Sequence, residues 1–528
     1  MACYKLFNGD LPELTYYIVQ YLRDEPKSLY SCALINRHLC RITIPMIWED
    51  PFAVRFKSWG GPYGFMDLFS YFLGDDDKEN FRDFGIVIKS NEPTPLFKYP
   101  TFIKTLVLSH LELHLNNWIR HRTQPRDSYN SCTEYSNKIK GFVCLTFIKL
   151  FVESDATLSR LSMKSSVSYD KFLPELFEII FHSTKFISNI KRLNIALSET
   201  DRSNIQEFVL TLSTLAPYIK QVEFSDFNGN LPAVITPQKQ LSSLTLKEIQ
   251  MDDQILDAIK QCFRSLNSIK FMNCEFKQVT SFDALNSFTN LHHLLFQHSD
   301  GLKNQMFQPL IDNPTSLKVR SLRLVGKLTE YSSLLQKIGP HVENLVIKLS
   351  FSHHERNAFD SVIKYCTKVK FLQISSIDSL DISQICELIT SIGAHLEYLS
   401  LKILFALNIP CILISSKLLG ELGPVLSKHS SSLNYLNLFL SIDPIYMRKF
   451  LDHVQHIDLK KLLIRNCHYE DVDVAFDVLK EFAEEQVIDD FVYEIVDYFC
   501  IHTKVRNYID KVQKNKYPDL VLRIPDFE

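Results

Sequence analysis

The feature that most constrains this chain is a short apolar pattern, L-x-x-L-x-L, that recurs through residues 158–470. In one copy Leu266, Ile269 and Phe271 hold the apolar positions, and Cys274 follows in the turn. Alternate side chains of a strand share a face, so the apolar positions enter one core and their neighbours face outward. With conservative apolar exchanges, the pattern begins at Leu158, Ile190, Ile219, Leu241, Leu266, Leu291, Val319, Val342, Val369, Leu396, Leu433 and Leu459.

These starting points lie 22 to 37 residues apart, about 27 on average, which is the range of repeats that pair a strand with a helix. Helical stretches fall between the strands, at 252–265, 331–338, 356–366 and 382–392. The insertion before Leu433, which contains Ser415 and Ser416, predicts a longer loop. The sequence therefore predicts an α/β fold, a leucine-rich-repeat solenoid with parallel strands on the concave face and helices on the convex face.

The N-terminal residues predict a separate unit of three short helices, at 13–22, 28–35 and 37–44. In the first helix Leu14, Ile18 and Leu22 form one apolar stripe, and Tyr17 and Tyr21 form a second beside it. A helix that is apolar over most of its circumference has to be covered on more than one side. About 45 residues cannot easily supply that cover, so we infer that the unit docks on a partner. The alternative is that it packs wholly against its own solenoid.

The same residues resemble the F-box. The matching positions are Leu11-Pro12-Glu13-Leu14, Ile18, Tyr21-Leu22, Leu29, Cys32, Leu34-Ile35-Asn36-Arg37, Pro45 and Trp48. One departure is Leu39, where the family often carries tryptophan. With the repeats, the chain is similar to F-box/leucine-rich-repeat proteins. This resemblance implies a substrate-recognition subunit of a Skp–cullin–F-box ubiquitin ligase, whose F-box binds a Skp-type adaptor and through it a cullin, while the repeats hold a target protein. The adaptor-binding residues it implies are Leu11, Pro12, Leu14, Ile18, Leu22, Leu34, Ile35 and Trp48.

Four segments follow from these patterns. We expect the F-box at 6–50, a linker and N-terminal solenoid cap at 51–157, the repeats at 158–470 and a C-terminal helical cap at 471–528. Within the second segment, Lys104 to Leu108 fits the strand pattern and predicts a divergent first coil, whose outer side needs polar capping.

The outward positions of the predicted strands carry ten basic residues and one acidic residue, Glu223, although the whole chain holds 58 Lys and Arg against 61 Asp and Glu. Aromatic residues, among them Phe371 and Phe439, cluster towards the C-terminal repeats. We therefore expect the concave face to bind an acidic or phosphorylated segment of a target. The alternative is that the cations only keep an exposed sheet soluble. The expected substrate-binding residues are Arg192, Lys247, Lys270, Arg323, Lys348, Tyr398, Lys402, Tyr435, Lys461 and Arg465.

No catalytic or cofactor motif is present in the sequence. With 14 glycines in 528 residues, about 2.7% against a usual ~7%, the chain lacks a glycine-rich phosphate loop, and it has neither G-x-S-x-G nor H-E-x-x-H. The adjacent histidines at 292–293 and 353–354 are poor chelates because neighbouring strand residues point to opposite faces. We expect a non-enzymatic protein without metal or cofactor.

Charge and cysteine usage bear on partners and location. A net charge of −3 does not favour a nucleic-acid binder. The twelve scattered cysteines, without a C-x-x-C pair, suggest reduced thiols. Neither a secretory signal nor an apolar run of about 18 residues is visible. We expect a cytoplasmic or nuclear protein. The remaining alternative to a ligase subunit is a leucine-rich scaffold that binds proteins through its repeats.

Overall fold

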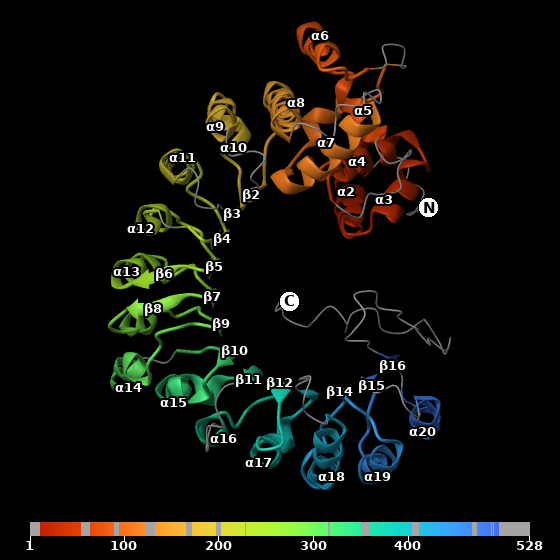
Figure 1. The fold of residues 1–528 in the computed structure, drawn as a ribbon, viewed down its shortest axis with the longest axis vertical. Helices are drawn as coiled ribbons and strands as arrows, with labels where there is room; N and C mark the ends of the chain where they lie inside the picture. Colours follow the sequence, from red (N-terminus) through yellow and green to blue (C-terminus); the bar gives the residue numbers. More distant parts are fainter. Residues whose placement is uncertain are drawn as a thin grey trace. The chain divides into compact units, whose positions relative to one another are not determined.

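The computed structural model describes residues 11–53, 64–88, 94–122, 133–164, 172–196, 202–227, 229–314, 317–349, 359–403, 411–466, 472–486, 488 and 490–495. The described chain is an α/β structure in which parallel strands alternate with helices (Figure 1). It divides into two compact units. The first comprises Met1–Thr280 with Ser287–Leu291, and the second comprises Ser281–Asn286 with His292–Glu528.

The described part of the first unit begins with three helices. They are α2 (Pro12–Gln20), α3 (Pro26–Ala33) and α4 (Arg37–Ile47). Pro12 and Pro26 stand in the first turns of their helices, where the missing N–H costs nothing. Asn36 caps α4, because its side-chain oxygen accepts a hydrogen bond from the Leu39 N–H at 2.8 Å. These helices lie within a few residues of the predicted ones.

The residues after α4 join the helices to the rest of the first unit. Backbone N–H groups of Lys104 and Thr105 donate to the Glu49 carbonyl at 3.0 and 2.9 Å. The Glu49 carboxylate pairs with Arg23 at 2.8 Å and with Lys104 at 2.5 Å. Four further helices belong to this part of the unit: α5 (Gly64–Ser70), α6 (Asp75–Asp83), α7 (Leu108–Arg122) and α8 (Thr133–Glu153). The N-terminal helices are therefore continuous with the first coil.

Six parallel strands form the ladder of the first unit: β1 (Thr105–Val107), β2 (Arg160–Lys164), β3 (Arg192–Ala196), β4 (Gln221–Ser225), β5 (Ser243–Lys247) and β7 (Ser268–Met272). Each pairs in parallel with the next in this order. The connecting helices are α9 (Leu173–Phe181), α10 (Thr184–Ile187), α11 (Arg202–Leu215), α12 (Leu231–Ile235) and α13 (Asp253–Gln261). The strand β1 lies within the stretch 104–108, where the sequence predicted a strand.

Eight parallel strands form the ladder of the second unit: β9 (His293–Gln297), β10 (Ser321–Gly326), β11 (Asn344–Leu349), β12 (Phe371–Ile377), β13 (Tyr398–Ile403), β14 (Tyr435–Leu440), β15 (Lys461–Asn466) and β16 (Asp490–Ile495). Their helices are α14 (Gln308–Asp312), α15 (Ser332–Ile338), α16 (Asp360–Tyr365), α17 (Ile382–Ile392), α18 (Cys411–His429), α19 (Pro444–Val454) and α20 (Val472–Glu485). Neighbours in this strand order pair in parallel.

The repeated pattern predicts the strands residue by residue. All twelve predicted starting residues are buried, and each is followed two residues later by the first residue of a strand. The two later apolar positions of each copy point inward: Leu372 and Ile374 in β12, for example, are fully buried. Cys274 is also buried, and its thiol donates to the Leu246 carbonyl of the preceding coil at 3.2 Å.

The structure differs from the sequence prediction in three places. Residues 411–429, predicted as a loop around Ser415 and Ser416, form α18, and both serines are buried. The Ser415 hydroxyl bonds the Cys411 carbonyl and also accepts from the Ser441 N–H, which explains how a helix holds a buried serine there. In the region predicted as a helical cap, 471–528, the described part forms α20 up to Glu485 and then β16, which extends the ladder, and residues 496–528 lie outside the described chain. A short side sheet pairs β6 (Gln250–Asp252) with β8 (Glu275–Gln278).

In several repeats, the residue directly after the strand has a left-handed backbone conformation. Asp226, Glu248, Asn273 and His298 each follow the last residue of a strand and have φ between 46° and 56°. The N–H of Glu248 donates to the Met272 carbonyl of the next strand, and that of His298 donates to the Val325 carbonyl. The turn therefore adds one more hydrogen bond to the ladder at the cost of a conformation that most L-residues disfavour.

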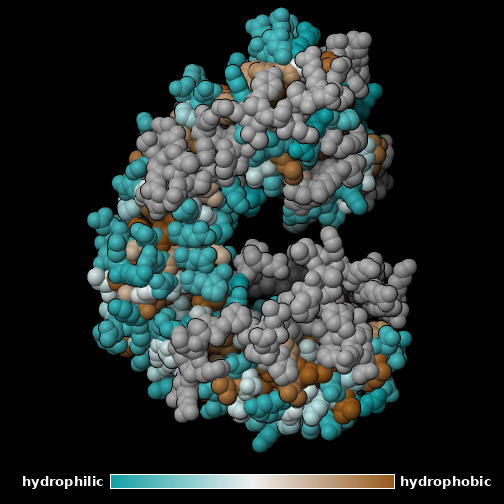
Figure 2. All heavy atoms as spheres, viewed as in Figure 1, coloured by the Kyte–Doolittle hydropathy of each residue, from teal (hydrophilic) through white to brown (hydrophobic). Residues whose placement is uncertain are grey.

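The outer helices meet solvent with mainly hydrophilic side chains, and brown apolar patches lie low in the view of Figure 2, where α17 to α20 are found. Leu413 and Ile445, near the starts of α18 and α19, are exposed apolar side chains. Within the described residues, no helix combines the length and the apolar character needed to cross a bilayer.

Candidate interaction surfaces

The first candidate surface lies on the N-terminal helices. Only Thr15 and Val19 of α2 are buried, because that side packs on α4. The other side of α2 and the turn between α3 and α4 leave large apolar side chains in solvent. This set, the N-terminal apolar surface, consists of Leu14, Tyr17, Ile18, Tyr21, Leu34 and Ile35, exposed by 49 to 89%.

Seven of the eight predicted adaptor-binding residues are at least partly accessible. Leu11, Pro12, Leu14, Ile18, Leu34 and Ile35 are exposed, and Leu22 is half-buried. Trp48 corrects the prediction, because its side chain is only 6% exposed. Its ring packs against Tyr99 at 4.3 Å and edge-on against Phe69 at 5.3 Å between centroids. Trp48 therefore anchors α4 to the helices that follow instead of contacting a partner. The sequence pattern indicated Tyr17 and Tyr21, but the resemblance did not assign them to the surface.

The outward face of the first unit's strands is basic and polar. Arg192 lies beside Arg160 in the ladder, and Lys270 lies beside Thr245. Lys247 pairs with the Glu223 carboxylate, the single acid predicted on this face. That ion pair neutralises part of the positive charge that was predicted for this face. The described outward positions of β1 to β7 carry no aromatic residue.

The outward face of the second unit has three parallel rows across β11 to β15, set by the strand register. The aromatic row is Asn344, Phe371, Tyr398, Tyr435 and Lys461. The middle row is Val346, Gln373, Ser400, Asn437 and Leu463. The cationic row is Lys348, Ser375, Lys402, Phe439 and Arg465.

Three rings of the aromatic row form a continuous stack. Phe371 and Tyr398 lie 4.0 Å apart between centroids, with planes inclined by 12°, and Tyr435 follows 4.3 Å beyond Tyr398 at 13°. All three rings are half-buried. Phe371 did not enter the predicted site, although its place in the repeat is the same as that of the two tyrosines. Repeat phase is the signal that identifies it.

The cationic row contains an ammonium group held over a ring. Lys402 Nζ lies 4.4 Å from the centroid of Phe439, its neighbour in the ladder. Such a contact positions the charge at the outward face of the sheet. Nearby, partial burial together with the charges of Lys348 and Arg323 holds the pKa of His298 below its ordinary value of 6.5. The structure therefore brings Arg323, Lys348 and His298 into one positive region.

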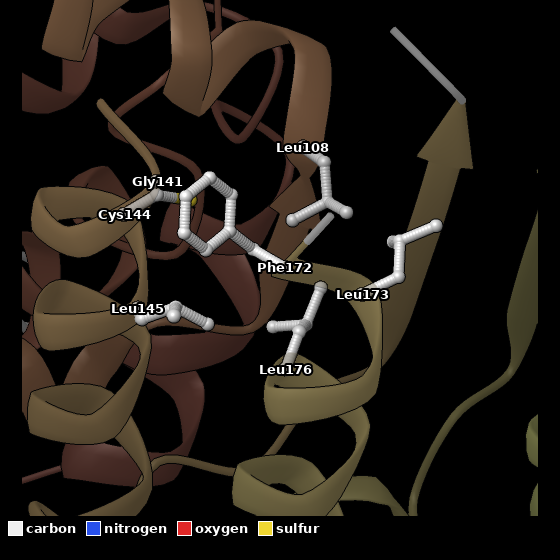
Figure 3. Close-up of a pocket in the computed structure, with 7 residues that line it drawn as sticks. All are labelled: Leu108, Gly141, Cys144, Leu145, Phe172, Leu173 and Leu176. Carbon is white, nitrogen blue, oxygen red and sulfur yellow. The ribbon is translucent and has the colours of Figure 1, made fainter. Parts of the chain in front are cut away.

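A pocket in the first unit is explained by side-chain packing. A small pocket between α7, α8 and α9 is lined only by apolar groups, and the Phe172 ring closes over Gly141 and Cys144 (Figure 3). A Cβ on Gly141 would lie 2.2 Å from that ring, so glycine is what allows this approach. The pocket offers no polar group that would orient a ligand.

The histidine, acidic and cysteine side chains of the described residues do not suit metal binding, and the buried cysteines do not suit thiol chemistry. No set of three or more His, Cys, Asp or Glu side chains suited to a metal ion occurs in the described part of the chain, and the histidine pair at 353–354 lies outside that part. Burial raises the pKa of the Cys366 thiol to about 12 and those of Cys262 and Cys386 to about 11. These cysteines are poor nucleophiles at neutral pH because the thiolate is the reactive form.

The comparisons with known proteins show a distant likeness. No protein-family model matches the chain, and no curated protein matches it. Among solved structures, it is similar to the complex of Rad7 and Elc1 in yeast, with 12% sequence identity and a TM-score of 0.30. The aligned region covers 67% of this chain and 87% of that chain. A likeness of this degree supports no functional inference.

Proposed function

We propose that this protein is the substrate-recognition subunit of a Skp–cullin–F-box ubiquitin ligase. In this role α2 to α4 form an F-box that binds a Skp-type adaptor and through it a cullin, and the strands form leucine-rich repeats that hold a target protein. The chain itself supplies no catalytic group, and ubiquitin transfer to the target is accelerated by proximity. We place the protein in the cytoplasm or nucleus, where such ligases work.

The observation that carries the proposal is the N-terminal apolar surface. Tyr21 is 89% exposed, Leu34 70% and Ile35 61%. Large apolar side chains that gather on one face of a soluble protein mark an interaction site. All residues of this surface except Tyr17 are positions at which the sequence resembles the F-box, so the resemblance and the exposure point to largely the same residues.

The alternative is a leucine-rich scaffold in which the N-terminal helices pack against the solenoid. Such packing would bury the outer side of α2, yet Leu14 and Ile18 remain 52 and 49% exposed. The observed exposure therefore favours a separate partner for α2. A scaffold would still bind proteins through its strands, so adaptor binding is what separates the two functions.

The test is a pull-down of a purified Skp-type adaptor, with and without its cullin, by the intact chain. The variant Ile18→Asp/Leu34→Asp should lose adaptor binding, because each carboxylate would be desolvated in an apolar interface. Leu96→Asp is the matched control, since Leu96 is 80% exposed and lies outside the N-terminal apolar surface. The control should bind like the intact chain, and both variants should keep the unfolding midpoint of the intact chain.

Two results would count against the proposal. Failure of the folded, intact chain to retain the adaptor would favour the scaffold. Binding that survives in Ile18→Asp/Leu34→Asp would place the adaptor contact elsewhere on the chain and separate it from the F-box resemblance.

A further inference from the structure

On β11 to β15, the aromatic row and the cationic row lie on opposite sides of the middle row. Their fifteen outward positions, all of them described, include four cations and no carboxylate. The cations lie in the cationic row, as Lys348, Lys402 and Arg465, and at the end of the aromatic row, as Lys461. On β16, the next strand of the ladder, Asp490 lies beside Lys461 and Glu494 lies beside Arg465. Lys348 and Lys402 are the cations of these rows whose ladder neighbours are not acidic, and this pair favours an anionic partner.

The aromatic row restricts what that partner can be. Both faces of the Tyr398 ring are covered, by Phe371 at 4.0 Å and by Tyr435 at 4.3 Å. The stack therefore offers ring edges and phenol hydroxyl groups to a ligand, and the faces within it are occupied. Single-stranded nucleic acid binds aromatic side chains by stacking bases on open ring faces. Ring edges instead pack against aliphatic side chains, and hydroxyl groups donate to carbonyl or carboxylate oxygens.

The middle row supplies groups that fit a peptide backbone. Gln373 and Asn437 are half-buried and flank the buried Ser400 across β12, β13 and β14. Amide and hydroxyl side chains both donate and accept hydrogen bonds, as peptide N–H and C=O groups do. The strands are paired on both sides, so a ligand cannot add to them as a further strand and has to be recognised by these side chains.

We propose that this surface binds an extended peptide segment in which apolar and acidic residues alternate, running across the strands from β11 to β15. Its backbone lies over the middle row, its apolar side chains contact the aromatic row, and its carboxylates face the cationic row. Five strands ~4.8 Å apart span about 19 Å, the length of about six extended residues. The inference deepens the proposed function, on which it rests, by naming the kind of target segment.

The experiment selects peptides from a random 12-residue library displayed on phage, using the full-length chain without any adaptor. Enriched peptides should show alternation of apolar and acidic residues over about six positions. For the best of them, Lys348→Glu/Lys402→Glu should weaken binding by about tenfold or more, measured by fluorescence anisotropy. The matched control is Arg160→Glu/Lys164→Glu, which reverses two exposed cations on the strands of the first unit. It should bind like the unchanged chain.

A second variant examines the middle row without changing charge. Gln373→Ala/Asn437→Ala should weaken peptide binding by about threefold to tenfold while leaving its salt dependence unchanged, because neutral hydrogen bonds are not screened. Both sets of variants are compared by circular dichroism and unfolding midpoint, so loss of folding is recognised directly.

Several results would overturn the inference. One is a library selection that enriches no peptide, or that enriches peptides without acidic residues. Another is an equal loss of peptide binding in the Arg160→Glu/Lys164→Glu control. A third is displacement of the bound peptide by an equimolar oligouridylate. The last result would assign the surface to nucleic acid. Adaptor pull-down is measured on the same preparations. Adaptor binding without peptide binding would refute this inference alone, and peptide binding without adaptor binding would refute the ligase function and leave a peptide-binding scaffold.

Discussion

Tyr398 and Tyr435 stack with ring centroids 4.3 Å apart and planes inclined by 13°, although 37 residues separate them in the chain. The strand register places them directly opposite each other on β13 and β14. A stack built by register belongs to the sheet, so it contributes to the stability of the fold. Its energy can be measured apart from any ligand.

A double-mutant cycle with Tyr398→Ala and Tyr435→Ala should give a coupling energy of about 0.5–1.5 kcal/mol. Urea unfolding of the four proteins supplies the measurement. Pairing Tyr398→Ala with Tyr446→Ala is the control, since Tyr446 is an exposed residue of α19 outside the stack. That pair should be additive. Additivity in the Tyr398/Tyr435 pair would mean that the rings are adjacent without stabilising each other.

Substitution of Trp48 should lower stability, whereas substitution of Ile18 should weaken adaptor binding and leave stability almost unchanged. Trp48→Ala removes a buried ring that packs on Phe69 and Tyr99, so it should lower the free energy of unfolding by about 3–5 kcal/mol. Ile18→Ala, at a 49% exposed position, should change it by less than about 0.5 kcal/mol. Urea unfolding monitored by circular dichroism distinguishes them. Equal destabilisation by both changes would show that the outer side of α2 is covered within the chain.

The left-handed turns predict a stabilising substitution. Glu248 has φ 56°, a conformation that asparagine adopts more readily than glutamate. Glu248→Asn should therefore raise the free energy of unfolding by about 0.5–1 kcal/mol. Asn273 holds the same place after the next strand at φ 53°, so the reverse change, Asn273→Glu, should lower it by a similar amount. Changes of the same sign at both positions would argue against backbone strain as the cause.

His298 predicts a pH effect of definite sign. Its pKa is lowered in the folded chain by partial burial first and by Lys348 and Arg323 second. The unfolded chain therefore binds a proton more readily, and this part of the stability is present above about pH 6.5 and lost as the pH falls through the folded pKa. An NMR titration should find the His298 pKa below 6.5, and Lys348→Gln should raise it.

Asparagine also suits the positive φ of His298, so His298→Asn should fold and should lack this part of the pH dependence. A pKa that does not move in Lys348→Gln would show that burial alone accounts for the shift. An acidic peptide bound beside Lys348 should likewise raise the His298 pKa, which links this titration to the proposed binding surface.

The candidate sites were predicted in part. The outward basic positions follow from strand alternation, and so does the place of Tyr398 and Tyr435. That Lys247 is paired with Glu223 does not follow, because the partner comes from another coil 24 residues away. The burial of Trp48 also escaped prediction, since Phe69 and Tyr99 reach it only through tertiary packing.

The sequence by itself determined where the strands lie. Period-2 alternation and a buried residue before each strand are local properties, so about six residues are enough to predict each strand. Only the tertiary structure decided which apolar residues are left in solvent and which side chains from different coils form one surface. Ser415 and Ser416 belong to a helix for the same reason, because the neighbouring coil satisfies a buried hydroxyl that a sequence pattern assigns to a loop. Whether a side chain is buried, and which group it pairs with, depends on residues distant in the chain. A local sequence pattern carries no information about those residues.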